Sequence, residues 1–176
     1  GVLNIVHGLG SSTGKAIVEH PQIKAISFTG GTETGKFIAK TAAPMFKKLS
    51  LELGGKNPNI IFADCDYEKM LATTVRSSFS NQGQICLCGS RIFVEASIYK
   101  QFKIDFIERV RQLVVGHPSD ESTQIGALVS KTHYEKVRSY IEGIDPTESR
   151  LLMGGEKIHV EGYENEVING ASKTLK

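Results

Sequence analysis

The alternation of short β-rich runs with longer helical stretches most constrains what this chain can fold into. Residues 2–6 and 25–29 have the composition of strands, and each is followed by a glycine-bearing turn. Helical stretches then occupy residues 12–20 and 32–43, with Pro44 just beyond the second one. Strands and helices that alternate in this way are typical of a layered α/β fold.

A third strand, at residues 48–53, alternates polar and apolar side chains. Successive side chains of a strand point to opposite faces, so Glu52 is expected on the face opposite Leu51 and Leu53. The glycine- and proline-bearing stretch 54–58 then breaks the pattern. We therefore predict a domain boundary after Leu53, with residues 1–53 in one domain and 54–176 in another.

The second half continues the alternation. We expect strands at 59–63 and 91–95, a helix capped by Asp64 or Asp66 and running to residue 79, a helix at 97–113, and a helix capped by Ser130 and running to 142. Beyond residue 145 the pattern weakens. The apolar stripes of the helix that ends at residue 79 and of the helix at 97–113 predict their buried faces. These faces comprise Leu71, Val75 and Phe79 in the former and Ile98, Phe102, Phe106, Val110 and Leu113 in the latter.

Composition excludes several classes of function. The chain has 176 residues, 40% hydrophobic and 23% charged, with 21 basic and 19 acidic residues and a formal net charge of +2. This balance indicates a globular protein without the basic footprint of a nucleic-acid-binding protein. No apolar run approaches the roughly 20 residues of a membrane-spanning helix, and the first residues do not resemble a secretory signal. We expect a cytoplasmic protein with small-molecule partners, and Gly1 as first residue suggests a fragment.

A glycine-rich stretch, SFTGGTETGKF, begins at Ser27 and resembles a nucleotide-hydrolysing P-loop. Such a loop needs Ser or Thr after its lysine to bind magnesium, and Phe37 offers no hydroxyl. A strand entering a glycine-rich turn at a helix N-terminus still suits a pyrophosphate, because free N–H groups point outward there. An ordinary β-to-α turn is the alternative. A second glycine stretch, from Gly8 to Gly14, is a weaker match to a dinucleotide-binding turn.

Cysteine and carboxylate residues supply the candidate chemistry. Cys86 follows a flexible polar run and precedes a strand, so its side chain can face a cleft, although a buried and inert thiol is the alternative. Cys86, Cys88 and Cys65 form no disulfide framework and, with scattered histidines, no metal site. Glu52 could be a partly buried general base or, equally, an ordinary residue on a solvated strand face.

Three segments together resemble the aldehyde dehydrogenase superfamily: FTGGTETG from Phe28, LELGGKNP from Leu51 and NQGQICLCGSR from Asn81. Their order and spacing match the family, and Cys86 follows Glu52 by 34 positions, as nucleophile follows general base there. The resemblance covers about residues 1–153. Within the family, the sequence of these segments is most similar to the branch that oxidises muconic semialdehydes.

The resemblance implies the end of a Rossmann-like cofactor domain followed by the first part of a catalytic domain. By the family mechanism, Cys86 forms a thiohemiacetal and then a thioester with an aldehyde, and Glu52 activates the hydrolytic water. NAD is the implied cofactor, with NADP left open, and a homo-oligomer is implied for the full-length parent. The residues implied to bind the cofactor are Thr29, Gly30, Gly31, Gly35, Leu53 and Gly54.

Two departures from the family accompany this resemblance. Many relatives have serine where this chain has Gly31, and the tail after about residue 156 does not follow the family pattern. We expect a central fragment of the enzyme with little activity of its own. An ATP-binding P-loop module and a truncated product that serves only for association remain as alternatives.

Overall fold

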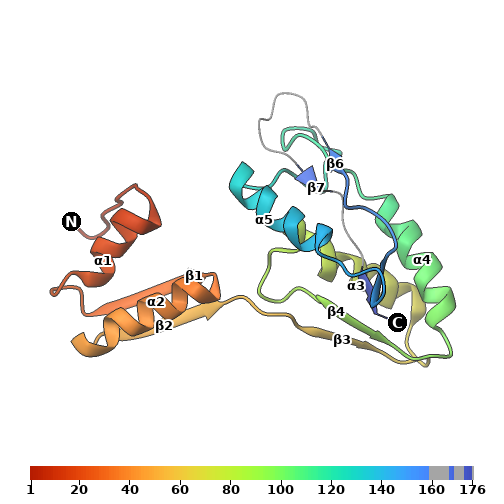
Figure 1. The fold of residues 1–176 in the computed structure, drawn as a ribbon, viewed down its shortest axis with the longest axis horizontal. Coiled ribbons are helices and arrows are strands. Elements are labelled where there is room, and N and C mark those ends of the chain that lie inside the picture. The colour runs from red at the N-terminus through yellow and green to blue at the C-terminus, as the bar shows by residue number, and fades with distance from the viewer. Residues whose placement is uncertain (159–166, 169–172, 176) are drawn as a thin grey trace. The chain divides into compact units, whose positions relative to one another are not determined.

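The computed structural model describes residues 1–158, 167–168 and 173–175 (Figure 1). Its chain divides into two compact units, unit 1 (Gly1–Gly55) and unit 2 (Lys56–Lys176). The division falls in the glycine-bearing stretch where the sequence predicts a boundary after Leu53. Helices and strands alternate in both units, which confirms the predicted α/β class.

A parallel pair of strands forms the sheet of unit 1. β1 (Ala25–Gly30) and β2 (Lys48–Leu53) pair in register along their whole length. Parallel neighbours need a crossover connection rather than a tight turn. Here α2 (Thr32–Ala42) and the short 3₁₀ helix η2 (Ala43–Met45) make that connection, and Figure 1 shows α2 lying along the sheet.

The two faces of this sheet differ in exposure. Along β2, Leu51 and Leu53 are half-buried and Glu52 is exposed, so the predicted alternation is confirmed. Thr29 lies directly opposite Glu52 in the register and is exposed as well. Unit 1 therefore has one face that packs against α2 and a second face that carries polar side chains.

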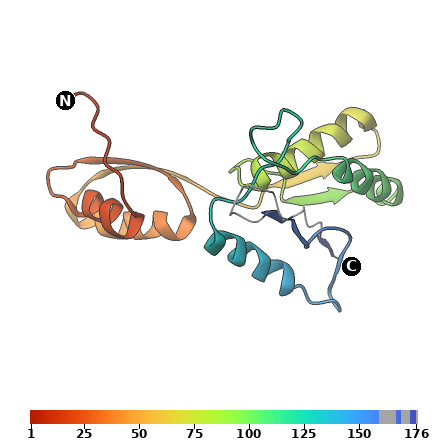
Figure 2. The same cartoon turned by 90° about the horizontal axis from the view of Figure 1, so that it is seen from above.

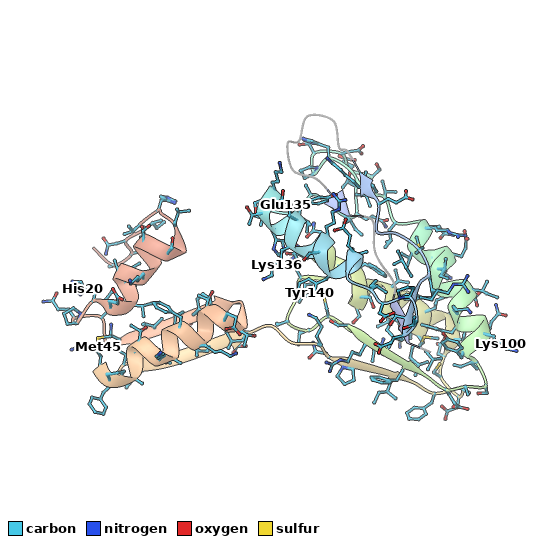
Figure 3. The ribbon with its side chains drawn as sticks, in the orientation of Figure 1. His20, Met45, Lys100, Glu135, Lys136 and Tyr140 are labelled. Atoms are coloured by element: carbon cyan, nitrogen blue, oxygen red, sulfur yellow. The ribbon has the colours of Figure 1, made fainter. Side chains whose placement is uncertain are left out.

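A buried lysine holds the first helices of unit 1. The chain enters through a π-helical turn, η1 (Gly10–Gly14), and continues as α1 (Lys15–Glu19). The Nζ atom of Lys47 donates to the carbonyl oxygens of Val18 at 2.5 Å and His20 at 2.7 Å. A cation at a helix C-terminus satisfies carbonyls that have no partner within the helix. Figure 3 labels His20, whose carbonyl oxygen is one of the two acceptors, and Met45, which precedes Lys47 in the chain.

The predicted strand at residues 2–6 is wrong. This segment lies outside every helix and strand of the described residues, and Val2 and Leu3 are 107% and 79% exposed. Its β-branched composition favours an extended backbone, but a strand forms only where its N–H and C=O groups find partners on a neighbouring strand. No such pairing involves residues 2–6 among the strand pairs of the described chain.

Unit 2 is built on a second parallel pair, β3 (Pro58–Ile61) and β4 (Arg91–Val94). α3 (Tyr67–Phe79) and the 3₁₀ turn η3 (Ser80–Gly83) connect the two strands, and α4 (Tyr99–Arg111) follows β4. Figure 2 shows α3 and α4 beside this sheet. The core confirms both predicted apolar stripes, since the buried cluster comprises Ile61, Leu71, Val75, Phe102, Phe106 and Val110, with Phe79, Ile98 and Leu113 packed against it.

The remaining elements of unit 2 are shorter. α5 (Lys131–Glu142) begins at Ser130, whose hydroxyl accepts a hydrogen bond from the N–H of His133 at 3.2 Å, as the predicted cap requires. Asp66 caps α3 in the same way. In the described part of the C-terminal region, the strands form two antiparallel pairs, β5 (Ser149–Leu151) with β8 (Lys173–Leu175) and β6 (Lys157–Ile158) with β7 (Val167–Ile168).

Substitution of Gly35 tests how α2 packs on its sheet. Gly35 is buried, and a Cβ atom there would lie 2.6 Å from Cδ2 of Leu53. We expect Gly35→Val to lower the free energy of unfolding of unit 1 by about 1–3 kcal/mol, as overpacking typically does. Amide hydrogen exchange of α2 peptides measures the change. Gly31→Ser is the matched control, because a Cβ at Gly31 meets nothing within 4 Å and serine is a good N-cap. Equal exchange in the two variants would contradict the packing argument.

Ionisation of Tyr67 is expected to lower the stability of unit 2 at high pH. Its hydroxyl donates to Oδ2 of Asp105 at 2.7 Å, and burial followed by this bond raises the pKa of Tyr67 from 10.0 to about 12. The phenol's contribution to stability is therefore complete below pH 10 and is lost as the pH rises towards about 12. The same bond is the largest cause of the lowered pKa of Asp105, whose contribution is lost as the pH falls below its ordinary value of 3.8.

We expect Tyr67→Phe to lower the free energy of unfolding by about 1 kcal/mol at neutral pH, the value of one hydrogen bond. The difference from wild type should shrink towards zero between pH 10 and 12. Urea unfolding followed by tyrosine circular dichroism measures it, because all five tyrosines lie in unit 2. Tyr99→Phe is the control, because the contact of Tyr99 is made by its ring, whose centroid lies 5.7 Å from Nζ of Lys103, and phenylalanine keeps that ring. A difference that stays constant up to pH 12 would contradict this assignment.

Candidate functional site

Cys86 lies at the corner of a tight turn. The N–H of Cys88 donates to the carbonyl oxygen of Ile85 at 3.0 Å, which closes a four-residue turn with Cys86 and Leu87 in its centre. Cys86 is exposed and Cys88 is buried, with its Sγ atom accepting from the N–H of Ile85 at 3.4 Å. The two thiols thus differ in exposure, and the turn lies between them.

A left-handed backbone segment precedes this turn. Asn81, Gln82 and Gly83 have φ angles of 50°, 55° and 74°. Residues other than glycine in this region cost about 1–3 kcal/mol each and persist only where the surroundings hold them. The segment follows α3 after Ser80, and Gly83 meets the need for positive φ without strain. The backbone that presents Cys86 is therefore strained and needs support.

Gly89 brings the chain back against α3 after the turn. Its N–H donates to Oγ of Ser77 at 3.0 Å, and its carbonyl oxygen accepts from Oγ of Ser78 at 3.2 Å. A Cβ atom at this position would lie 2.8 Å from Oγ of Ser77. The motif glycine thus allows the close contact between the turn and the helix.

Asn57 supports the turn directly. Its Nδ2 atom donates to the carbonyl oxygen of Cys86 at 2.6 Å and to that of Cys88 at 3.1 Å. Its own carbonyl oxygen accepts from the N–H of Arg91 at the start of β4, at 3.1 Å. In the sequence, Asn57 is only part of the stretch that marks a break between domains. Its side-chain amide, which can donate two hydrogen bonds, was the available signal.

Glu52 belongs to unit 1, whereas Cys86 belongs to unit 2. Within unit 1 its carboxylate lies on the exposed face of β2, beside Thr29 of β1. The sequence left two alternatives for Glu52, a partly buried carboxylate or a position on a solvated strand face. Within unit 1, Glu52 lies on an exposed strand face. That Glu52 and Cys86 act together in one site stays a prediction.

The predicted cofactor residues gather at one edge of unit 1. Gly30 and Leu53 are opposite each other in the register, at the carboxyl ends of β1 and β2. Gly31 then caps α2, and Gly54 follows β2. In open α/β sheets, ligands bind at the carboxyl ends of the strands. The structure thus brings together five of the six residues, namely Thr29, Gly30, Gly31, Leu53 and Gly54.

Gly35, the sixth residue, has a different environment. It is buried in α2 and packs against Leu53. This position explains the glycine by helix–sheet packing, whether or not a ligand lies nearby. Its N–H is also used, since it donates to the carbonyl oxygen of Gly31 at 3.0 Å.

The N-terminus of α2 has two features that a bound pyrophosphate would need. The first turn of a helix leaves N–H groups without partners in the helix, and the space around Gly31 is open. The one acidic side chain of that turn, Glu33, is paired with Nζ of Lys36 at 2.7 Å. Phe37 holds the position where a P-loop needs a hydroxyl, so the ATP-binding alternative gains no support here.

The described residues also bear on metal and membrane binding. Among them, no group of three or more His, Cys, Asp or Glu side chains could hold a metal ion. Within that part of the chain, every helix is too short or too polar to span a bilayer.

The sequence resembles known enzymes along nearly its whole length. A family described as "Aldehyde dehydrogenase family" matches residues 1–170. The chain is 59% identical to 2-aminomuconic semialdehyde dehydrogenase of Danio rerio over 80% of its own length and 29% of that protein. It is 45% identical to 2-aminomuconic 6-semialdehyde dehydrogenase of a Pseudomonas species, over 97% of its length and 34% of that protein. The chain thus spans about a third of the length of these curated relatives.

Solved structures give the same result for the fold. A betaine aldehyde dehydrogenase from Staphylococcus aureus, crystallised with NAD+, superposes with a TM-score of 0.82 at 38% identity. The match covers 86% of this chain and 30% of that one. The HpcC protein of Thermus thermophilus superposes with a TM-score of 0.83 at 42% identity, over 87% of this chain and 30% of that one.

Alkylation tests the exposure of Cys86. We expect iodoacetamide at neutral pH to label Cys86 first, half-buried Cys65 more slowly and buried Cys88 last. Mass spectrometry of the digested chain measures the order, and the urea-unfolded chain is the control in which all three thiols should react alike. Preferential labelling of Cys65 or Cys88 in the folded chain would contradict the geometry of the turn.

Proposed function

Because the chain belongs to the aldehyde dehydrogenase family, we propose that it carries the nucleophile, the general base and the pyrophosphate-binding turn of an NAD-dependent semialdehyde oxidation. The product is the corresponding carboxylic acid. The observation that carries this proposal is the exposed thiol of Cys86 at the corner of a turn held by Asn57.

The relatives support the class of substrate and cofactor. Curated relatives at 45–59% identity are named 2-aminomuconic semialdehyde dehydrogenases, and another at 48% is named for 5-carboxymethyl-2-hydroxymuconate semialdehyde. A muconic semialdehyde is therefore the proposed substrate. The NAD+ in the Staphylococcus aureus structures supports NAD rather than NADP as the proposed cofactor.

In the proposed reaction, the thiolate of Cys86 attacks the carbonyl carbon of the aldehyde. A C–S bond forms, and the carbonyl oxygen becomes the oxyanion of a thiohemiacetal. The N–H of Cys86 is available to this oxyanion, because the turn's own bond uses the N–H of Cys88. Bound NAD+ supplies the acceptor for the hydride that leaves the same carbon, and its pyrophosphate would be held at Gly30, Gly31 and the N-terminus of α2.

Glu52 completes the proposed reaction. Its carboxylate takes a proton from water, and the resulting hydroxide adds to the thioester carbon. The C–S bond then breaks, which releases the acid and returns Cys86 as a thiolate. Overall, one aldehyde, one NAD+ and one water give one carboxylic acid, one NADH and one proton.

Adduct formation at Cys86 tests the proposed function most directly. The chain is incubated with NAD+ and 2-hydroxymuconic semialdehyde, NADH is followed by absorbance, and the intact mass is measured after rapid quenching. An adduct at Cys86 together with NADH is expected, and Cys86→Ser should give neither. NADH formation at the same rate by Cys86→Ser would contradict the proposal. The adduct is the primary readout because a single turnover is enough to form it.

Glu52→Gln should separate the two halves of the reaction. In a protein that spans the full length of the curated relatives, only thioester hydrolysis needs the general base, so we expect a burst of NADH close to one per nucleophilic cysteine and then turnover reduced about 10²- to 10⁴-fold. Stopped-flow absorbance measures both phases. Glu19→Gln is the matched control, since Glu19 is also exposed in unit 1 but pairs with Lys15 on α1. A lost burst with normal steady-state turnover would show that Glu52 has another role.

A further inference from the structure

The strained segment before Cys86 is held from one side by side-chain amides. Nε2 of Gln82 donates to the carbonyl oxygen of Gly126 at 3.0 Å. Nε2 of Gln84 donates to Oε1 of Gln82 at 3.3 Å, and Oε1 of Gln84 lies 2.7 Å from Nε2 of His133. These contacts connect the first turn of α5 to the left-handed segment across 49 positions of the chain.

The direction of every hydrogen bond in this series follows from its last member. The carbonyl oxygen of Gly126 can only accept, so Gln82 must turn its NH₂ group towards Gly126. Its oxygen then faces Gln84, which must present its own NH₂ group, and the oxygen of Gln84 faces His133. His133 must therefore carry a proton on Nε2. This deduction does not depend on how the amide groups are assigned, because one end of the series is a backbone carbonyl.

We propose that His133 is a positioning residue for Cys86, acting through this directed series of hydrogen bonds, which we call the relay (His133, Gln84, Gln82 and the carbonyl of Gly126). The relay holds the left-handed segment and so keeps the Cys86 turn in place. The backbone of His133 is itself fixed by the Ser130 cap, at 3.2 Å. The proposal deepens the proposed function, on which it rests for the role of Cys86 as nucleophile.

The relay and Asn57 support the turn from different elements. Asn57 holds the carbonyl groups of Cys86 and Cys88 from the start of β3. The relay holds the residues just before them from α5 and from Gly126. Since the segment from Asn81 to Gly83 is strained, loss of the relay should release it towards ordinary negative φ angles.

Hydrogen exchange of the Cys88 amide tests the relay, because that N–H closes the turn. The 176-residue chain is compared with His133→Ala, His133→Gln and Gln84→Glu by NMR. We expect exchange about fivefold faster in His133→Ala, as loss of one hydrogen bond from the closed state would give. His133→Gln should restore the wild-type rate, because a glutamine amide can donate from a similar position.

Gln84→Glu tests the direction of the relay. Glutamate has nearly the shape of glutamine but only accepts, so it leaves Gln82 without its donor or turns the oxygen of Gln82 towards the carbonyl of Gly126. Exchange should be about as fast as in His133→Ala. Wild-type exchange in Gln84→Glu would overturn the directed series, and wild-type exchange in His133→Ala would overturn the support by His133.

Lys136→Ala is the matched control on α5. Figure 3 labels Lys136 together with Glu135 and Tyr140 on this helix, and all three side chains are exposed. The control should exchange as wild type does, and amides of α3 and α4 should be unchanged in every variant. Faster exchange in Lys136→Ala would show that any change in α5 loosens the turn, which would overturn the specific role of His133.

The rate of adduct formation at Cys86 tests the consequence for chemistry. It should fall about tenfold in His133→Ala and recover in His133→Gln, since a misplaced nucleophile lowers the rate rather than the binding. Faster exchange with an unchanged adduct rate would overturn positioning while leaving the relay. If wild type forms no adduct, the proposed function fails, whereas the exchange experiment still decides the relay.

Discussion

Parallel strand pairing is the constraint on which the candidate residues of each unit depend. Strands that run in the same direction begin at one edge of their sheet and end at the other. In unit 1 the carboxyl ends of β1 and β2 bring Gly30 beside Leu53, and Thr29 beside Glu52. In unit 2 the amino ends of β3 and β4 bring Asn57 to the N–H of Arg91.

The same constraint explains why Asn57 meets Cys86. The crossover from β3 through α3 must return the chain to the edge where β3 began, because β4 is parallel to it. The Cys86 turn is the last part of that return, so it arrives beside the residue that precedes β3.

Hydrogen bonds and the core of unit 2 hold the strained backbone around Cys86 in place. Three successive residues with positive φ follow α3 after Ser80. The core of unit 2 fixes where that helix lies, since Leu71 and Val75 pack with Phe106 and Ile61. Polar contacts then hold the turn against this fixed helix, from Ser77 and Ser78 on α3 and from Asn57 before β3. An exposed thiol on a supported turn suits a nucleophile, which must reach its substrate without moving far.

The sequence by itself determined the α/β class, the strand and helix periodicities, the caps at Asp66 and Ser130, and the membership of the aldehyde dehydrogenase family. These are local properties or properties of motif spacing, and they need no knowledge of the neighbours in space. The apolar stripes of α3 and α4 were predictable for the same reason, because helical periodicity alone defines a face. Whether the motif residues bind and react as the family implies stays a proposal.

Only the tertiary structure decided which side chains meet across long separations in the chain. Residues 2–6 have the composition of a strand but no partner strand among the described residues, so composition alone misled. Gly35 fits a phosphate-binding motif, yet its contact with Leu53 comes from the packing of α2 on the sheet. The sequence does not show which groups Asn57 and His133 contact, because a hydrogen bond spanning 29 or 49 positions depends on where the fold places both partners.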